Sequence, residues 1–287
     1  MAGLSRRSGS WRRSKPQSWQ DWLAGEEHDQ IALEADLALA RAATRRTAAI
    51  LLDQREGALR RAIAAIEADI AAGALSAAQR QLDELLARVP LGRRLTEPWL
   101  VAIAGPPNVG KSSLINALVG YERAIVYHQA GTTRDVLTAD AAIDGWPVRL
   151  IDAAGIRATL DPLEAEGVAR ARQQIARADL VLWISDATAP DDPADRSFAF
   201  ELERLSAGAV IRVVNKIDLA PTSAAAGDVR LSARTGEGLD RLLELAARRL
   251  VPNPPPPGAA VPFTARQACM LEGLRQGLGR GAAPAAR

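Results

Sequence analysis

Apolar residues recur at three- and four-residue steps between about residues 26 and 89, in a stretch rich in Ala, Leu, Glu, Gln and Arg. This spacing and composition predict amphipathic helices. Gly73 is expected to end one helix and Ser76 to cap the next. We therefore expect an antiparallel helical hairpin or small bundle, whose role is packing and partner contact. The residues predicted to line its buried face are Ile50, Leu51, Leu59, Ile63, Ile66 and Ile70.

After Pro98 the pattern changes to short apolar runs that alternate with helical stretches. Most of these runs are too apolar for a sheet with one solvated face, so they predict strands covered on both sides. Alternation of strands and helices predicts a mostly parallel, doubly wound α/β sheet. The predicted strands are 99–104, 147–152, 179–185, 209–214 and 228–231, and the predicted helices are 111–120, 165–177, 195–206 and 238–250.

Composition divides the chain into five segments. Residues 1–25 form a basic tail and residues 26–96 a helical domain, followed by an α/β domain over 97–251. Residues 252–262 are rich in proline and predict a stiff, extended linker. Residues 263–287 form a C-terminal helix and tail, which we expect to pack back against the N-terminal helices.

The overall charge and cysteine content exclude few functions. The net charge of +2 is too small to indicate nucleic acid by itself, and the single cysteine, Cys269, excludes an internal disulfide. No run reaches the roughly 18 apolar residues of a membrane span, so we expect a cytoplasmic protein with no membrane partner. The basic N-terminal tail lacks the apolar core of a signal peptide. It is either disordered or an arm whose tryptophans stack on RNA bases.

The strongest chemical motif runs from Gly105 to Ser112, Gly-Pro-Pro-Asn-Val-Gly-Lys-Ser. It fits the G-x-x-x-x-G-K-[ST] phosphate loop, in which backbone N–H groups cradle phosphates and the lysine neutralises their charge. The alternative is a simple glycine turn before a helix. The hydroxyl of Ser112 is expected to ligate Mg²⁺. The phosphate-binding residues predicted here are Asn108, Val109, Gly110, Lys111, Ser112 and Ser113.

A second motif, Asn215-Lys216-Ile-Asp218, selects the base. It follows a predicted strand, so its side chains emerge at the carboxyl edge of the sheet, where α/β folds bind ligands. The Asp218 carboxylate can accept hydrogen bonds from N1–H and the exocyclic amine of guanine, whereas adenine offers neither donor there. Alone this string is more often a surface turn, but after a phosphate loop it predicts a guanine site.

Three further segments complete the predicted site. Asp152 ends a strand and is expected to hold Mg²⁺ through water, while the Gly155 amide reaches the γ-phosphate; a plain turn is the alternative. The segment that begins Ser232-Ala233-Arg234 follows the last strand and is expected to wrap the base, with the Ala233 amide near the guanine carbonyl oxygen. Between the phosphate loop and Asp152, a switch segment is expected to place a threonine on Mg²⁺.

These ordered motifs, together with Gly131-Thr-Thr-Arg-Asp-Val-Leu137, resemble the MnmE (TrmE) family of tRNA wobble-uridine-modifying GTPases. The resemblance is specific over about 97–250 and implies a P-loop NTPase G domain inserted in or attached to an α-helical domain. It also implies GTP hydrolysis to GDP and Mg²⁺ as a cofactor, with Thr133 as the switch ligand. Family members also carry an N-terminal folate-binding domain and a C-terminal cysteine motif, and neither pattern is recognisable here.

The resemblance further indicates how water is activated. Ile156 stands where Ras-like GTPases carry a water-orienting glutamine, and an apolar side chain cannot do this. The family uses a glutamate downstream, a position that Glu164 matches; Glu166 and a solvated helix-start acid are the alternatives. The family also replaces an arginine finger with K⁺, bound partly by an asparagine that matches Asn108. G domains are then expected to form a homodimer across their nucleotide faces.

Three biological roles stay open at this stage. One is tRNA modification together with another chain that supplies the missing functions. A second is ribosome assembly of the Era or EngA type, in which the basic tail binds rRNA. The third is a scaffold gated by GTP and GDP without hydrolysis.

Overall fold

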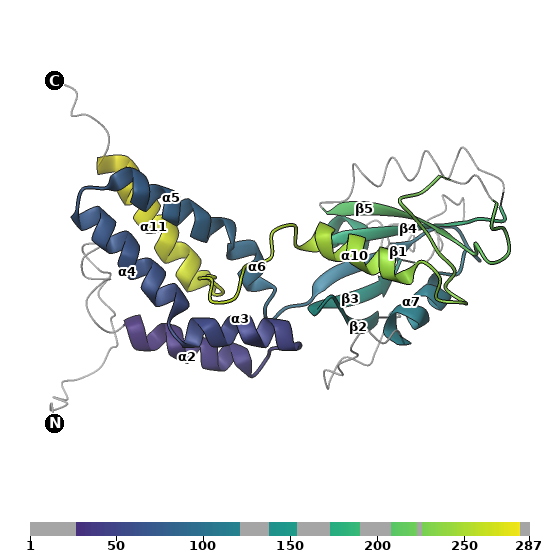
Figure 1. Cartoon of the computed structure of the whole chain (residues 1–287), viewed down its shortest axis with the longest axis horizontal. Coiled ribbons are helices and arrows are strands. Elements are labelled where there is room, and N and C mark those ends of the chain that lie inside the picture. Colours follow the sequence, from purple (N-terminus) through teal and green to yellow (C-terminus); the bar gives the residue numbers. More distant parts are fainter. Residues whose placement is uncertain (1–26, 121–137, 154–172, 190–207, 223–225, 282–287) are drawn as a thin grey trace, which may run out of the picture.

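The structure is a computed structural model that describes residues 27–120, 138–153, 173–189, 208–222 and 226–281. Within these residues, one group of helices lies beside a sheet with its own flanking helices (Figure 1). We call the first group the helical unit. It comprises α2 (Glu27–Leu39), α3 (Arg45–Arg55), α4 (Ala58–Ala71), α5 (Leu75–Ala87), α6 (Val89–Arg93) and α11 (Ala265–Gly281).

The described strands form one sheet in the order β2-β3-β1-β4-β5-β6. Neighbours are parallel except β2, which pairs antiparallel with β3 at one edge. Parallel neighbours place their carboxyl ends at the same edge, which is where the candidate site lies. The strands are β1 (Trp99–Ala104), β2 (Thr138–Ile143), β3 (Trp146–Asp152), β4 (Leu180–Asp186), β5 (Ala209–Asn215) and β6 (Val229–Arg230), with α7 (Lys111–Gly120) and α10 (Leu239–Leu250) against them.

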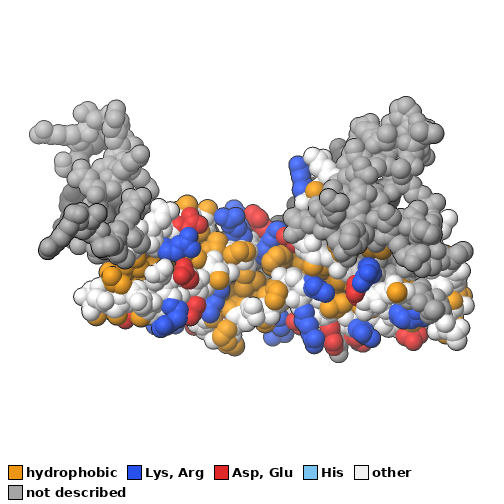
Figure 2. Space-filling model, turned by 90° about the horizontal axis from the view of Figure 1, so that it is seen from above, with side chains coloured by type: hydrophobic (Ala, Val, Ile, Leu, Met, Phe, Trp, Pro, Cys, Tyr) orange, Lys and Arg blue, Asp and Glu red, His pale blue; other side chains and the backbone are white. Residues whose placement is uncertain are grey.

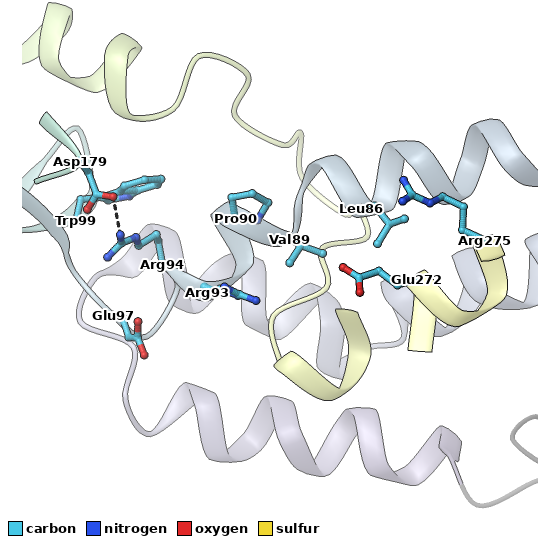
Figure 3. Close-up of a pocket in the computed structure, with 10 residues that line it drawn as sticks. All are labelled: Leu86, Val89, Pro90, Arg93, Arg94, Glu97, Trp99, Asp179, Glu272 and Arg275. Carbon is cyan, nitrogen blue, oxygen red and sulfur yellow. Dashed lines mark hydrogen bonds and ion pairs between the residues drawn. The ribbon is translucent and has the colours of Figure 1, made fainter. Parts of the chain in front are cut away.

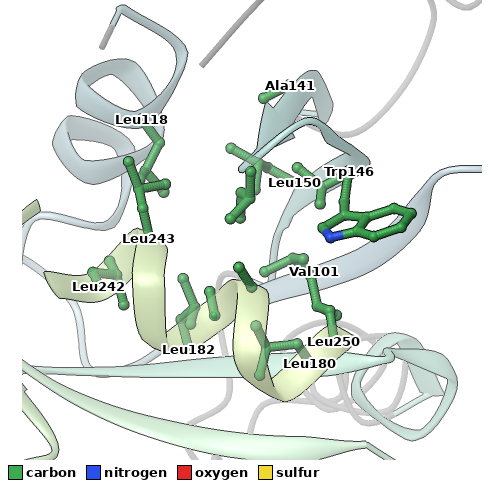
Figure 4. Close-up of a cluster of buried hydrophobic side chains, with 14 of the residues drawn as sticks. Val101, Leu118, Ala141, Trp146, Leu150, Leu180, Leu182, Leu242, Leu243 and Leu250 are labelled. Carbon is green, nitrogen blue, oxygen red and sulfur yellow. The ribbon is translucent and has the colours of Figure 1, made fainter. Parts of the chain in front are cut away.

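Alternate residues of the central strands enter two different hydrophobic clusters. Val101 and Leu182 belong to the cluster that α7 and α10 cover (Figure 4). Ala102 and Val181, one residue away on the same strands, belong to a second cluster with Ile175. Because successive side chains of a strand point to opposite faces, the sheet is covered on both sides. The predicted doubly wound α/β class is confirmed.

The sequence missed β2. Its residues, Thr-Ala-Asp-Ala-Ala-Ile, are mostly alanine and threonine, so they form no apolar run. The signal that would have found it is the dipeptide Asp144-Gly145, whose φ angles of 50° and 77° give the type I′ turn of a two-residue hairpin. The predicted helix 195–206 lies outside the described residues, and only 173–177 of the predicted helix 165–177 are described.

The helical unit has a core of its own. Leu59, Ile63 and Ile66 of α4 pack with residues of α5 and α11, as predicted, whereas Ile50 and Ile70 are only partly buried. Gly73 does end α4: it adopts φ 77° and Ala74 N–H reaches back to Asp69 C=O. The predicted cap at Ser76 is wrong, because α5 begins one residue earlier, at Leu75 after Ala74.

The proline-rich segment is attached to the helical unit, so it is not a free spacer. The buried amide of Gln54 donates to Ala259 C=O at 3.0 Å and accepts from Val261 N–H at 3.1 Å. Arg88 donates to Ala260 C=O at 2.9 Å. The chain therefore returns from the sheet into the helical unit along a fixed path, and α11 packs against α5 as expected.

The hairpin between β2 and β3 contacts the helical unit. Thr44, which caps α3, donates to Gly145 C=O at 2.6 Å. Arg46 pairs with Asp144 at 3.0 Å and lies 5.1 Å from the ring centre of the buried Trp146. The hydrophobic cluster of the sheet continues into α2 and α3 through side chains such as Leu51. These contacts fix the helical unit on the end of β3 opposite to Asp152.

Gly92 offers a test of this arrangement. A Cβ on this buried α6 residue would lie 1.8 Å from Pro262 C=O, so Gly92→Ala forces the returning segment away. We expect it to lower the free energy of unfolding by about 1–3 kcal/mol. Gly273→Ala is the matched control, because this exposed helical glycine has open space around it and the change is expected to add up to about 1 kcal/mol. Urea unfolding followed by circular dichroism measures both, and an unchanged Gly92→Ala would contradict the packing.

Candidate functional site

The phosphate loop connects β1 to α7 at the carboxyl edge of the sheet. Gly105 adopts φ 150°, and a Cβ there would lie 2.3 Å from Ile184 C=O of β4. Only glycine fits that approach, which lets the loop turn tightly over the sheet. Lys111, the first residue of α7, donates from Nζ to Gly105 C=O at 3.0 Å and Pro106 C=O at 2.8 Å. The ammonium is thus held within the loop, beside the N-terminus of α7, which favours anions.

Asn215 connects the phosphate loop to the predicted base-binding segment. The residue is 2% exposed; its Nδ2 donates to Val109 C=O at 2.8 Å and its Oδ1 accepts from Ala233 N–H at 3.0 Å. A Cβ on Gly110 would lie 2.5 Å from Nδ2, so this glycine makes room for the amide. The Ala233 amide, expected near a guanine carbonyl, therefore binds Asn215 in this structure. The asparagine sets the distance between the two loops.

Asp152, Lys111 and Ser112 lie together at this edge, as predicted. Asp152 ends β3 and its side chain is nearly buried. Burial raises the pKa of Asp152, opposed by the charge of Lys111 and a hydrogen bond with Ser112. Burial likewise lowers the pKa of Lys111, opposed by Asp152. Asp152 and Lys111 therefore each stabilise the charged form of the other.

The same group fits Mg²⁺. Among the described residues, Asp152 Oδ1 is buried without a hydrogen-bond partner. An unpaired buried carboxylate oxygen is costly, and a hard cation or its water offers the missing partner. The hydroxyl of Ser112 supplies a second oxygen donor. Within the described part of the chain, the side chains give no cluster of three or more His, Cys, Asp or Glu suited to another metal.

Lys216 connects the phosphate loop to the carboxyl end of β4. Its Nζ donates to Asn108 C=O at 2.7 Å and to Asp186 Oδ2 at 2.6 Å. Burial of Asp186 opposes its charge, but hydrogen bonds from Lys216 and Thr188 prevail and lower its pKa. Asp186 was not predicted from the sequence. It ends β4 beside Asn215 of β5, so the rule that drew attention to residues after strands would have found it.

The predicted base-reading carboxylate, Asp218, is held by two neighbours. Ser232 donates to Oδ1 at 2.6 Å, and Arg234 donates to Oδ2 from Nε at 2.9 Å and Nη2 at 2.7 Å. These hydrogen bonds, Ser232 first and Arg234 next, lower the pKa of Asp218. The carboxylate therefore stays ionised, as an acceptor of two guanine donors must.

Three predicted site residues, Thr133, Gly155 and Glu164, lie outside the described residues. Ser113 is exposed in the first turn of α7, beside Ser112. Asn108, the predicted K⁺ ligand, is exposed in the phosphate loop with φ 63°. The structure thus brings together the predicted phosphate, Mg²⁺ and base residues that it describes.

A separate cavity of about 510 Å³ lies at the opposite edge of the sheet, where the helical unit meets β1 and β4 (Figure 3). Arg94 crosses this junction and pairs with Asp179 at 2.5 Å, beside Trp99. The lining of the cavity also carries charges of both signs, such as Arg93 and Glu97, so the cavity does not favour a polyphosphate. The cavity belongs to the junction and is distant from the phosphate loop.

Comparisons with known proteins agree with this geometry. Residues 100–216 match the family described as 50S ribosome-binding GTPase. The tRNA modification GTPase MnmE of Rhodopseudomonas palustris is 45% identical over 201 residues, covering 68% of this chain and 41% of that protein. MnmE of Paracidovorax citrulli is 46% identical over 190 residues, covering 59% and 39% respectively. The chain therefore spans less than half the length of these relatives.

Among solved structures, Era from Aquifex aeolicus is 29% identical, with a TM-score of 0.43, and the match covers 58% of this chain and 62% of that one. At that score the likeness supports no further conclusion. The sequence identity to MnmE, the GTPase family match and the arrangement of Lys111, Asp152 and Asp218 agree with one another. The G domain of this chain is therefore similar in sequence to that of the tRNA modification GTPase MnmE.

Proposed function

We propose that the chain hydrolyses GTP with Mg²⁺ and K⁺ and uses the reaction in tRNA modification. The observation that carries the guanine proposal is the Asp218 carboxylate at the carboxyl edge, held by Ser232 while Asn215 joins the base segment to the phosphate loop. Two donors of guanine match its two oxygens, and adenine matches neither.

The described residues divide the binding of nucleotide between them. The backbone of Val109 and Gly110 and the ammonium of Lys111 face the phosphates, while Ser112 and Asp152 hold Mg²⁺. When bound, the metal neutralises charge on the β- and γ-phosphates. Thr133 and Gly155 are proposed to join these residues as switch elements, by resemblance to the family.

Water positioning and potassium rest on the family resemblance. Glu164 is proposed to orient the attacking water, because Ile156 cannot. Asn108 is proposed to hold K⁺ in place of an arginine finger, with a second G domain completing the site. Asn108 supports this proposal by its position: the residue is exposed at the surface of the phosphate loop, and its carbonyl accepts a hydrogen bond from Lys216.

A role in tRNA modification is supported by the relatives, which are named for that activity and are 45% and 46% identical over their matched parts. The family match described as ribosome-binding favours the second candidate, a role in ribosome assembly. On the face shown in Figure 2, the described residues show Lys and Arg interspersed with Asp and Glu and form no single basic patch. The charges on that face therefore favour neither tRNA nor rRNA.

No helix in the described residues has the length and apolarity needed to cross a bilayer.

Asp186→Asn tests how the site is positioned. The neutral amide loses the charge that holds Lys216 against Asn108 C=O, so we expect GDP affinity to fall about tenfold, or ~1.4 kcal/mol. Asp140→Asn is the matched control. Asp140 is similarly buried, 11% exposed against 12% for Asp186, and pairs with Arg149 on the same sheet. Isothermal calorimetry measures both affinities. Equal losses in the two variants would mean that the effect of Asp186 is not local.

Hydrolysis in KCl against NaCl tests the ion and the water residue. We expect K⁺ to raise the turnover rate, Asn108→Ala to remove that stimulation, and Glu164→Ala to lower the rate about 100-fold or more even in K⁺, as general base and water-orienting residues do. Glu166→Ala is the control and should retain turnover. If potassium gives no stimulation, the ion proposal fails while guanine binding stands. If Glu164→Ala keeps the full rate, another group orients the water.

Deletion of the gene in its host separates the two RNA roles. A role in tRNA modification predicts loss of the modified wobble uridine from total tRNA, measured by nucleoside mass spectrometry. Re-expression of the chain should restore it, and Lys111→Ala should not, because phosphate binding is lost. Normal tRNA with accumulation of immature ribosomal subunits would contradict this role and support the alternative.

A further inference from the structure

The side chain of Arg234 uses the acceptor that guanine would need. A carboxylate has about four lone-pair sites, two on each oxygen. On Asp218, Oδ1 accepts one hydrogen bond, from Ser232 at 2.6 Å. Oδ2 accepts two, from Arg234 Nε at 2.9 Å and Nη2 at 2.7 Å. Oδ2 therefore carries both hydrogen bonds from Arg234, and Oδ1 carries the one from Ser232.

Guanine requires both oxygens. Its N1–H and exocyclic amine are parallel donors, and a bidentate carboxylate meets them with one oxygen each. Oδ1 can accept one of them beside Ser232, but Oδ2 can accept the other only if the Arg234 guanidinium gives up at least one bond. The cation also neutralises the carboxylate, which weakens its attraction for the base.

The arginine side chain is the part free to move. It is 73% exposed, whereas the side chain of Asp218 is 10% exposed and Ser232 is fully buried. The turn that carries Arg234 is fixed by its own backbone: Ser232 N–H binds Glu237 C=O, and Gly236 N–H binds Ser232 C=O, both at 2.9 Å. Release thus requires a rotamer change and no movement of the loop.

We propose that Arg234 is a built-in competitor for the guanine-reading carboxylate, so that the base binds by displacing its guanidinium. This rests on the proposed guanine site. A base that offers two donors compensates for the lost ion pair, whereas a base that offers none leaves the pair closed. Arg234 therefore lowers the affinity for a guanine nucleotide and leaves the affinity for a base without those donors unchanged. It acts on the base through Asp218, as a competitor for that carboxylate.

The test is calorimetric titration of GDP and ADP into the wild-type chain, Arg234→Ala and Arg234→Lys, with Mg²⁺ and salt held constant. An exposed ion pair contributes little, so Arg234→Ala should bind GDP about two- to fivefold more tightly. Arg234→Lys keeps the charge but loses the fork of two donors, and its affinity should lie between the two. Arg212→Ala removes a similarly exposed arginine that pairs with Asp228 away from the site, and should leave affinity unchanged.

A second measurement links the effect to Asp218. The variant Asp218→Asn favours xanthosine diphosphate, and in it Arg234 no longer faces a carboxylate. Adding Arg234→Ala to this variant should therefore not change the affinity for xanthosine diphosphate. If the single variant Arg234→Ala bound GDP no more tightly than the wild-type chain, the proposal would be overturned. Weaker binding than wild type would mean that Arg234 contacts the nucleotide. If the wild-type chain bound ADP as well as GDP, or bound neither, the guanine site itself would fail instead.

Discussion

The site depends on one buried amide. Asn215 uses its nitrogen on Val109 of the phosphate loop and its oxygen on Ala233 of the base segment, so one side chain fixes two loops that lie far apart in sequence. Loss of the amide would leave a buried carbonyl and a half-buried N–H without partners, and unpaired buried groups are costly. Gly110 permits the contact because a Cβ would collide with the amide nitrogen. The distance between phosphate and base recognition is therefore set by an asparagine and a glycine.

The parallel register of the sheet determines which charges meet around that amide. Asp186 of β4 lies beside Asn215 of β5, and Asp152 of β3 beside Ile103 of β1, so strand ends bring carboxylates to the phosphate loop. Their environments then differ. Asp186 is stabilised as an anion by Lys216 and Thr188, whereas burial of Asp152 disfavours its charge and leaves one oxygen without a partner. A structural carboxylate and the carboxylate proposed to bind Mg²⁺ thus arise from similar positions at the ends of β4 and β3.

Hydrophobic runs predicted the buried parallel strands well, because burial on both faces requires nearly continuous apolar sequence. The alanine-rich β2 was missed, since its place is fixed by pairing with β3 and by the Asp144-Gly145 turn. Motif spacing predicted that Lys111, Asp152 and Asp218 lie at the same edge of the sheet. It did not predict Asp186, nor that Arg234 would lie on Asp218. Asp186 lies at a strand end like the predicted residues, whereas the position of Arg234 depends on the conformation of the 232–238 turn.

The position of β3 links the helical unit to the nucleotide site. Trp146 at one end of this strand lies under Arg46, and Asp152 at the other end lies beside Lys111 and Ser112. Between these residues the strand is almost fully buried and pairs with β1 and β2 along its length, so it cannot bend independently of them. Asp152 is therefore rigidly connected to the β2–β3 hairpin, which Thr44 and Arg46 contact. The helical unit thus contacts β3 at the end opposite to the one that carries Asp152.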